Sequence, residues 1–210
     1  GVSGGLDSTL ALLVAVETMR RLGRPSKNVI GITMPGFGTS GKTYQNSLKL
    51  MELLDITSVE IPIKDACIQH FKDIDHDIND KSVTYENAQA RERTQILMDY
   101  ANKVKGRVVG TGDLSELALG WCTYNGDHMS MYGVNGGVPK TLVRWMVVSL
   151  AERAEFEICK DILLDIADTP ISPELLPPEE DGKIAQKTED LVGPYELHDF
   201  FLYYILRYGY

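Results

Sequence analysis

Alternating helical and strand-like patterns of apolar positions organise the chain. Apolar residues recur at helical spacing from Leu6 to about Leu22, and Val29–Met34 is a short apolar run that ends at a Pro-Gly pair, as a buried strand does. The alternation continues with a predicted helix, strand, helix and strand at Thr43–Leu54, Val59–Ile63, Glu86–Val104 and Arg107–Gly110. This order predicts an α/β fold in which a parallel sheet carries helices on both faces.

The last part of the chain is predicted to contain a loop and an aromatic helix. Ser172–Lys187 is rich in proline and acidic residues, which is typical of a mobile loop. Gly193–Tyr208 carries Tyr195, Leu197, Phe200, Phe201, Tyr203, Tyr204 and Leu206. A helix with so many large apolar side chains must pack on something, either the core of its own domain or a second copy in an oligomer.

Composition narrows the class of protein. The 210 residues suffice for one domain, and their formal net charge of −9 argues against a nucleic-acid partner, which needs clustered cations. We find no apolar run of the roughly 18 residues that a membrane span requires. Cys67, Cys122 and Cys159 are scattered and form no CxxC pair, so we expect a soluble domain in a reducing compartment, the cytoplasm.

Two glycine-rich loops compete as a phosphate site. The first, Ser3–Ser8, has the sequence SGGLDS and opens a predicted helix, where exposed N–H groups bind anions. The carboxylate of Asp7 would repel a bare phosphate, which suggests Mg²⁺ between the two. The alternative interpretation is an ordinary capped helix after a glycine turn.

The second loop, Gly36–Thr43, matches both the GxxxxGK[ST] pattern of P-loop triphosphatases and GxGxxG. That pattern is far more frequent by chance than SGGxDS, and we find no apolar strand ending in an acid suited to the triphosphatase metal. We therefore interpret this loop as a decoy for the triphosphate that could still form a wall of a nucleotide pocket.

A third cluster of polar and glycine residues lies further along the chain. Residues 109–116, VGTGDLSE, again run from a strand into a helix, and they are followed by the Gly-rich stretches 120–127 and 135–140. Trp121 and Tyr124 could stack on a flat ring, and Lys140 could reach a phosphate. Core packing for the aromatics and a solvated surface position for the lysine are equally good interpretations.

Taken together, these segments resemble the synthetase domain of glutamine-dependent NAD synthetase, a family of ATP pyrophosphatases marked by SGGxDS. The resemblance runs in order through most of the chain, in GVSGGLDST (1–9), MPGF (34–37), ENAQARERT (86–94), GTGDLSELALGWCTY (110–124), GVPKTL (137–142) and GPYELHDFFLYYILRYG (193–209). It implies an adenine-nucleotide alpha-hydrolase-like fold over residues 1–210.

The resemblance also implies an ATP site with Mg²⁺ as cofactor. The residues that would contact ATP are Gly1, Val2, Ser3, Gly4, Gly5, Leu6, Asp7, Ser8, Thr111, Lys140 and Ser172. Asp7 would be a Mg²⁺ ligand, and Lys140 would neutralise the departing pyrophosphate. Glu116 would either hold a second Mg²⁺ or face the other substrate, deamido-NAD.

Deamido-NAD would be bound by a second set of residues. By resemblance these are Asn87, Arg91 or Arg93, Glu116, Trp121, Cys122, Thr123 and Tyr124. The nicotinate carboxylate would attack the α-phosphorus of ATP, pyrophosphate would leave, and ammonia would open the adenylated intermediate to the amide. Asp113 could orient or deprotonate that ammonia, or only cap the helix that follows it.

The long form of the family also implies partners. Its amidase domain, which supplies ammonia from glutamine, its strand leading into Gly1 and its C-terminal segment lie outside these 210 residues, so we expect a fragment of a longer, homo-oligomeric protein. Rival interpretations are a GMP-forming or tRNA-thiolating pyrophosphatase, a P-loop triphosphatase built on Lys42, and a nucleotide-binding module without catalysis. Asp73–Asn79 resembles a calcium-binding EF-hand loop, but Ile78 stands where that loop needs glycine, so we expect a solvated acidic loop.

Overall fold

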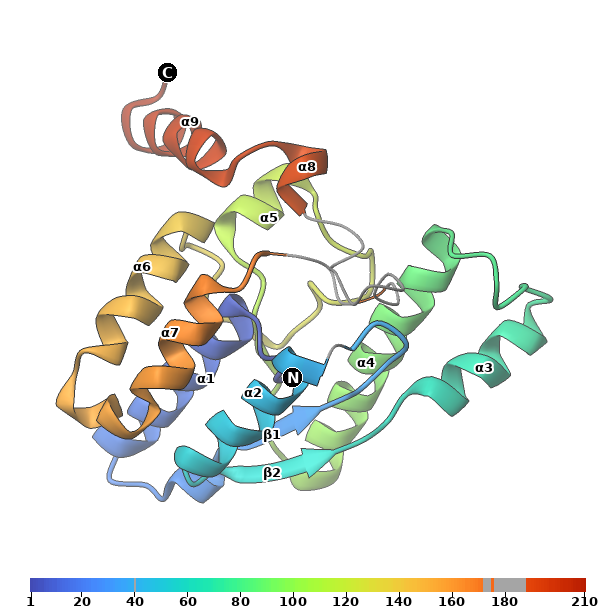
Figure 1. Cartoon of the computed structure of the whole chain (residues 1–210), viewed down its shortest axis with the longest axis horizontal. Coiled ribbons are helices and arrows are strands. Elements are labelled where there is room, and N and C mark those ends of the chain that lie inside the picture. Colours follow the sequence, from blue (N-terminus) through green and yellow to red (C-terminus); the bar gives the residue numbers. More distant parts are fainter. Residues whose placement is uncertain (40, 172–174, 176–187) are drawn as a thin grey trace.

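The structure, a computed structural model, describes residues 1–39, 41–171, 175 and 188–210 (Figure 1). Its helices and strands follow one another as α1 (Leu6–Arg21), β1 (Ile30–Thr33), α2 (Gly41–Leu53), β2 (Thr57–Glu60), α3 (Lys64–Asp73), α4 (Val83–Val104), β3 (Val109–Gly110), α5 (Leu114–Leu119), β4 (Tyr132–Gly133), α6 (Lys140–Ala151), α7 (Lys160–Asp168), α8 (Thr188–Val192) and α9 (Tyr195–Tyr208). Short 3-10 turns lie at Ser26–Asn28 and Ala154–Cys159.

Strands β1 and β2 are parallel and have helices on both faces, as predicted. Ile30 pairs with Thr57 and Thr33 with Glu60. Ile30 and Ile32 contribute to a hydrophobic cluster with α4, whereas Gly31 faces α2. A Cβ on Gly31 would lie 2.5 Å from the sulfur of Met51, so glycine permits α2 to approach the strand this closely.

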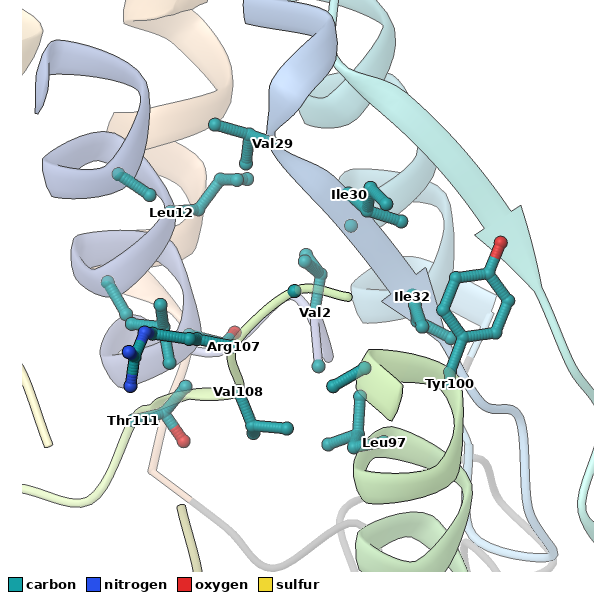
Figure 2. Close-up of a pocket in the computed structure, with 18 of the residues that line it drawn as sticks. Val2, Leu12, Val29, Ile30, Ile32, Leu97, Tyr100, Arg107, Val108 and Thr111 are labelled. Atoms are coloured by element: carbon teal, nitrogen blue, oxygen red, sulfur yellow. The ribbon is translucent and has the colours of Figure 1, made fainter. Parts of the chain in front are cut away.

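The second pair of strands, β3 and β4, is also parallel. Residues of β1 and β3 contribute to the lining of a cavity of about 300 Å³ (Figure 2). Apolar side chains from α1, β1 and α4 line this cavity, among them Leu12, Ile32 and Leu97. The described strands form two small sheets and not the one continuous sheet that the sequence predicts.

The main core lies in a layer of helices, on the side of β1 that faces α2. Leu10 and Leu13 of α1 pack with residues of α2, α6 and α7, including Leu50, Val143 and Leu163, all of them nearly inaccessible to solvent. Helices α1, α6 and α7 lie side by side in this layer, and α9 contacts α5 and α6 at the upper edge of the molecule in Figure 1. The core therefore anchors α1 and α6, two of the three helices whose beginnings carry the candidate site.

Several element boundaries differ from the predicted ones. The strand predicted at Val59–Ile63 is Thr57–Glu60, because Pro62 cannot donate to a ladder, and only Val109–Gly110 of the strand predicted from Arg107 is paired. Helix α4 begins at Val83, three residues earlier than predicted. The loop predicted at Ser172–Lys187 lies outside the described residues except for Leu175. Among the described helices, none is long and apolar enough to cross a membrane.

Candidate active site

The SGGLDS loop bends sharply into the first turn of α1. Gly4 has φ +92, and the Ser3 hydroxyl accepts a hydrogen bond from the Gly5 N–H at 3.2 Å, while the Ser3 and Ser8 hydroxyls lie 3.2 Å apart. Ser3 is exposed, and Gly5 and Asp7 are partly exposed, so a ligand can reach the loop. The helix start directs free N–H groups toward this opening, as an anion site requires.

Beside this loop, one lysine meets three carboxylates. Lys140 is only 1% exposed, and its Nζ lies 2.6 Å from Asp7 Oδ2, 2.7 Å from Asp113 Oδ2 and 2.7 Å from Glu116 Oε1. The carboxylates come from the first turn of α1 and the start of α5, and Lys140 is the first residue of α6. The fold thus gathers three helix beginnings at one point, which confirms that Lys140 is not a solvated surface lysine.

The charges of this cluster depend strongly on one another. Burial raises the pKa of Asp7 to about 7, although Lys140 acts to lower it. Burial likewise raises the pKa of Glu116. Burial alone would lower the pKa of Lys140, but Asp7, Glu116 and Asp113 outweigh it and hold that pKa above the ordinary value. Lys140 therefore stays positively charged, and its single charge does not neutralise all three of the carboxylates that it faces.

The donor set of the cluster fits Mg²⁺. One oxygen from each of Asp7, Asp113 and Glu116 lies within 4.8 Å of the others, and carboxylate oxygens are the ligands that Mg²⁺ prefers. Asp7 Oδ1 is buried and accepts no hydrogen bond from the part of the chain that the structure describes, so it has an unused ligand position. These residues could hold a divalent cation.

Asp113 has two contacts of its own. Its Oδ1 accepts a hydrogen bond from the Glu116 N–H at 2.8 Å and so caps α5, while Oδ2 faces Lys140. The capping interpretation is confirmed. Because Asp113 is fully buried and both oxygens are engaged, a role with ammonia stays a prediction that these contacts do not favour.

Asn135 joins the two loops at the site, and sequence reasoning assigned it no role. It is 1% exposed, and its Nδ2 donates to the backbone oxygens of Asp7 (2.9 Å) and Thr111 (3.1 Å). Thr111, a predicted ATP contact, is therefore held beside the SGGLDS loop. The sequence signal that could have identified Asn135 is its position in a glycine-rich stretch, because asparagine side chains often form hydrogen bonds with backbone groups.

The second glycine-rich loop lies next to the first, but its lysine forms an ion pair outside the site. Lys42 is well exposed, and its Nζ pairs with Asp165 Oδ1 of α7 at 2.7 Å. The Thr43 backbone packs against Gly4, where a Cβ would lie 2.2 Å from Thr43 O. The loop thus supports the first loop, and its lysine is committed to a surface ion pair, as expected of a decoy.

The residues predicted to bind deamido-NAD come together in part. Thr123 Oγ1 donates to Asn87 Oδ1 at 2.7 Å, and Arg91 Nε donates to Tyr124 O at 3.1 Å, so α4 supports the stretch Trp121–Tyr124. Tyr124 is 75% exposed and Cys122 is exposed, which leaves both accessible to a ligand. Tyr124 is therefore not packed in the core.

Arg93 lies on a different wall from Arg91. Its Nε donates to Met34 O at 3.1 Å, at the end of β1. Beside it the buried Gln89, which the sequence did not single out, accepts from the Phe37 N–H and donates to Tyr85 O and Leu175 O. The predicted ATP contact Ser172 lies outside the described residues.

Solved structures place this arrangement in a known fold class. An NMN synthetase from Francisella tularensis aligns with 96% of the chain and 74% of its own, at 28% identity and a TM-score of 0.76. A glutamine-dependent NAD+ synthetase from Acinetobacter baumannii, solved with ADP, aligns with 98% of the chain and 34% of its own, at 25% identity and a TM-score of 0.69. The fold is thus the adenine-nucleotide alpha-hydrolase-like fold.

Sequence comparison then identifies the family within that class. The NAD synthase family model matches residues 1–205, and the chain belongs to this family. A glutamine-dependent NAD(+) synthetase from Mycobacterium leprae is 46% identical over all of the chain, which corresponds to 32% of the relative. The chain therefore spans about a third of the length of that curated relative.

Proposed function

We propose that this domain catalyses the ATP-dependent amidation of deamido-NAD to NAD, with release of AMP and pyrophosphate. The observation that carries the proposal is the meeting of Asp7, Glu116 and the buried Lys140 at the SGGLDS loop, in which Ser3 is exposed and Gly5 partly exposed. Membership of the NAD synthase family supports the same reaction. A module that only bound a nucleotide would have no need for a buried cation and three acids at this point.

The reaction asks this chain to hold charge and to orient two nucleotides. The free N–H groups at the start of α1 face the phosphates of ATP, and Lys140 stabilises the negative charge that grows on pyrophosphate as the bond from the α-phosphorus to its bridging oxygen breaks. Mg²⁺, held by Asp7 and Glu116, would supply further charge neutralisation and relieve Lys140 of part of its pairing with these acids.

Binding of deamido-NAD is assigned to the wall formed by α4 and residues 121–124. Asn87 fixes Thr123 and Arg91 fixes the Tyr124 backbone, so Trp121 and Tyr124 are presented to the nicotinate end. The ring carboxylate attacks the α-phosphorus to give an acyl adenylate, and ammonia then attacks the acyl carbon and expels AMP. Orientation of the two nucleotides supplies much of the rate.

Some features of the whole protein are part of the same proposal. The support for an amidase domain elsewhere in the polypeptide, with glutamine as nitrogen donor, is the length and name of the Mycobacterium leprae relative. We also propose a homo-oligomer, because α9 exposes many aromatic side chains. A cytoplasmic location is consistent with three cysteines that are all free thiols.

The test compares two loop variants by their products from ATP. In the whole protein, with deamido-NAD and ammonium, we expect Asp7→Ala to lower AMP formation by about 1000-fold or more, since a loss of roughly 4 kcal/mol of transition-state stabilisation gives that factor. Lys42→Ala, which removes only a surface ion pair, is the matched control and is expected to stay within about threefold of the wild type.

Three outcomes would contradict the proposal. ADP and phosphate as products, lost with Lys42→Ala, would assign the site to the P-loop. AMP formed only with xanthosine monophosphate or tRNA would assign another acceptor. Because the Francisella tularensis neighbour is an NMN synthetase, deamido-NMN is included, and its preference over deamido-NAD would change the substrate but not the reaction.

A further inference from the structure

A single buried carboxylate on α9 connects that helix to the start of α6. Asp199 is 7% exposed. Its Oδ2 accepts hydrogen bonds from the Thr141 N–H at 2.8 Å and from the Thr141 hydroxyl at 2.7 Å, and its Oδ1 accepts one from the Ser115 hydroxyl of α5. All three bonds involve residues directly beside Lys140 or Glu116 in the sequence.

Helix α6 requires such an acceptor from outside. Its N-cap is Pro139, whose side chain cannot accept a hydrogen bond, so the first N–H groups of the helix lack a cap from their own segment. Asp199 satisfies the N–H of Thr141, and Ser115 Oγ accepts from the N–H of Lys140 at 2.9 Å. The negative charge of Asp199 also stands at the positive end of the α6 dipole, where it is favourable.

This capping fixes the lysine of the site. Ser115 lies one residue before Glu116, and Thr141 one residue after Lys140, so Asp199 binds α5 and α6 at the points from which the ion pair Lys140–Glu116 arises. The ring of Tyr195, one turn earlier on α9, lies 5.5 Å from Lys140 Nζ. Helix α9 therefore contacts the start of α6 and the ammonium of Lys140 together.

We propose that Asp199 is a positioning residue that sets the place of Lys140 against the carboxylates and the pyrophosphate of ATP. Asp199 touches none of the reacting groups and acts through Ser115 and Thr141. The inference rests on the proposed function, in which Lys140 stabilises the leaving pyrophosphate. It adds that this stabilisation depends on a carboxylate of α9, a helix that lies outside the SGGLDS loop and the elements that carry the three acids.

Exchange of labelled pyrophosphate into ATP, measured on the whole protein with deamido-NAD, reports adenylation without the ammonia step. Asp199→Asn keeps the volume but replaces one acceptor by a donor, and we expect it to lower the maximal exchange rate by about 10- to 100-fold, with the KM for deamido-NAD within about twofold. Glu196→Gln removes an exposed carboxylate from the same helix and is expected to match the wild type.

A double-mutant cycle separates positioning from a general structural effect. Lys140→Gln removes the charge but keeps a donor, and in that background Asp199→Asn should slow exchange by less than about twofold, because the group it positions has gone. If Asp199→Asn does not fold, Thr141→Val removes one of the three bonds and keeps the carboxylate. Thr141→Val should slow exchange by about 3- to 10-fold when Lys140 is present, and it should have no such effect in the Lys140→Gln background. This size is expected because the variant removes one hydrogen bond from a neutral hydroxyl to a charged acceptor.

Two results would overturn the inference while leaving the proposed function intact. One is exchange by Asp199→Asn at the rate of Glu196→Gln. The other is the same fold-loss from Asp199→Asn, or from Thr141→Val, in the presence and in the absence of Lys140. If the wild type catalysed no exchange, the proposed function would fail and the inference would fall with it.

Discussion

At the scale of single residues, the site is organised by one ammonium group. Lysine is almost never buried unless it is paired, and Lys140 is paired three times over. Its ammonium donates hydrogen bonds to Asp7 and Glu116 and forms an ion pair with Asp113, so each acid limits where the others can lie. Removing one partner of a buried ion pair leaves an uncompensated charge, which makes these four residues depend on one another.

Gly4 is the residue at which the backbone permits no side chain. Its φ is +92, and a Cβ would lie 2.2 Å from the Thr43 backbone oxygen. We expect Gly4→Ala to lower pyrophosphate exchange by at least about 100-fold, because a left-handed residue costs about 1–3 kcal/mol and the loop must also shift. The measurement is the exchange rate of the folded variant at saturating ATP.

The neighbouring glycine is the matched control. Gly5 has φ −87, and among the described residues a Cβ there would approach the Ser3 hydroxyl at 3.4 Å, an ordinary contact. Gly5→Ala is expected to retain exchange within about tenfold, a difference of ~1.4 kcal/mol at most. Equal losses in the two variants would mean that the conformation of Gly4 is not what the loop requires.

At the scale of elements, the helices of the molecule differ in how clearly the sequence predicts them. The helix at Leu6–Arg21 follows a clear apolar period and was predicted almost to its boundaries. Helices α6 and α7 were not predicted. Helix α6 is apolar on most sides and contains several β-branched valines, which have a low helix propensity, and it forms because Val143, Val147 and Ala151 are completely buried against its neighbours.

The SGGLDS loop leads directly into α1, so the packing of this helix determines how firmly the loop is held. Leu13 is 0% exposed in the main core. We expect Leu13→Ala to lower the opening free energy of this helix by about 2–5 kcal/mol, the usual range for a fully buried leucine. Hydrogen exchange of α1 peptides in the whole protein measures this quantity.

The control for that variant lies just beyond the end of the same helix. Leu22 is 64% exposed, and Leu22→Ala should change the opening free energy by less than about 0.5 kcal/mol. If the two leucines had equal effects, burial in the main core would not be what stabilises α1.

At the scale of the whole molecule, the described chain leaves the aromatic face of α9 exposed. We define this face by its exposed residues Leu197, Phe200, Phe201, Tyr203, Tyr204, Ile205, Leu206 and Tyr208. Only Tyr195 and Asp199 of the helix are buried. In the part of the chain that the structure describes, most of these side chains are therefore not packed in the core, and the oligomer interface stays a prediction.

A second copy of the protein is the expected cover, because contiguous apolar surface of this kind marks an interface. We expect that Phe201, replaced by the photo-crosslinking residue benzoylphenylalanine, yields covalent dimers on irradiation. Val83 is also exposed but lies at the start of α4, and the same replacement there should yield none. The measurement is the mass of the irradiated protein under denaturing conditions, which shows whether covalent dimers have formed. Dimers from neither position, or from both positions equally, would contradict an interface on this face.

The sequence by itself determined the class of fold and the candidate residues of the site. Helical and strand periods follow from burial on one face or two, which is a local property, and the SGGLDS loop carries its own conformational requirements in Gly4. It also identified Asp7, Glu116 and Lys140 as candidates. Parallel pairing and helices on both faces of β1 and β2 were confirmed, whereas the single sheet was not.

Only the tertiary structure decided which of these residues act together. Lys42 and Lys140 are both lysines near glycines, but one pairs with Asp165 at the surface and the other is buried among three acids. Asn135, Gln89 and Asp199 have no distinctive local pattern, because a hydrogen-bonding side chain reveals its role only through a partner that can be 84 residues away, as for Asp199 and Ser115. Contacts of this range depend on how the helices pack, and local spacing along the chain carries no information about them.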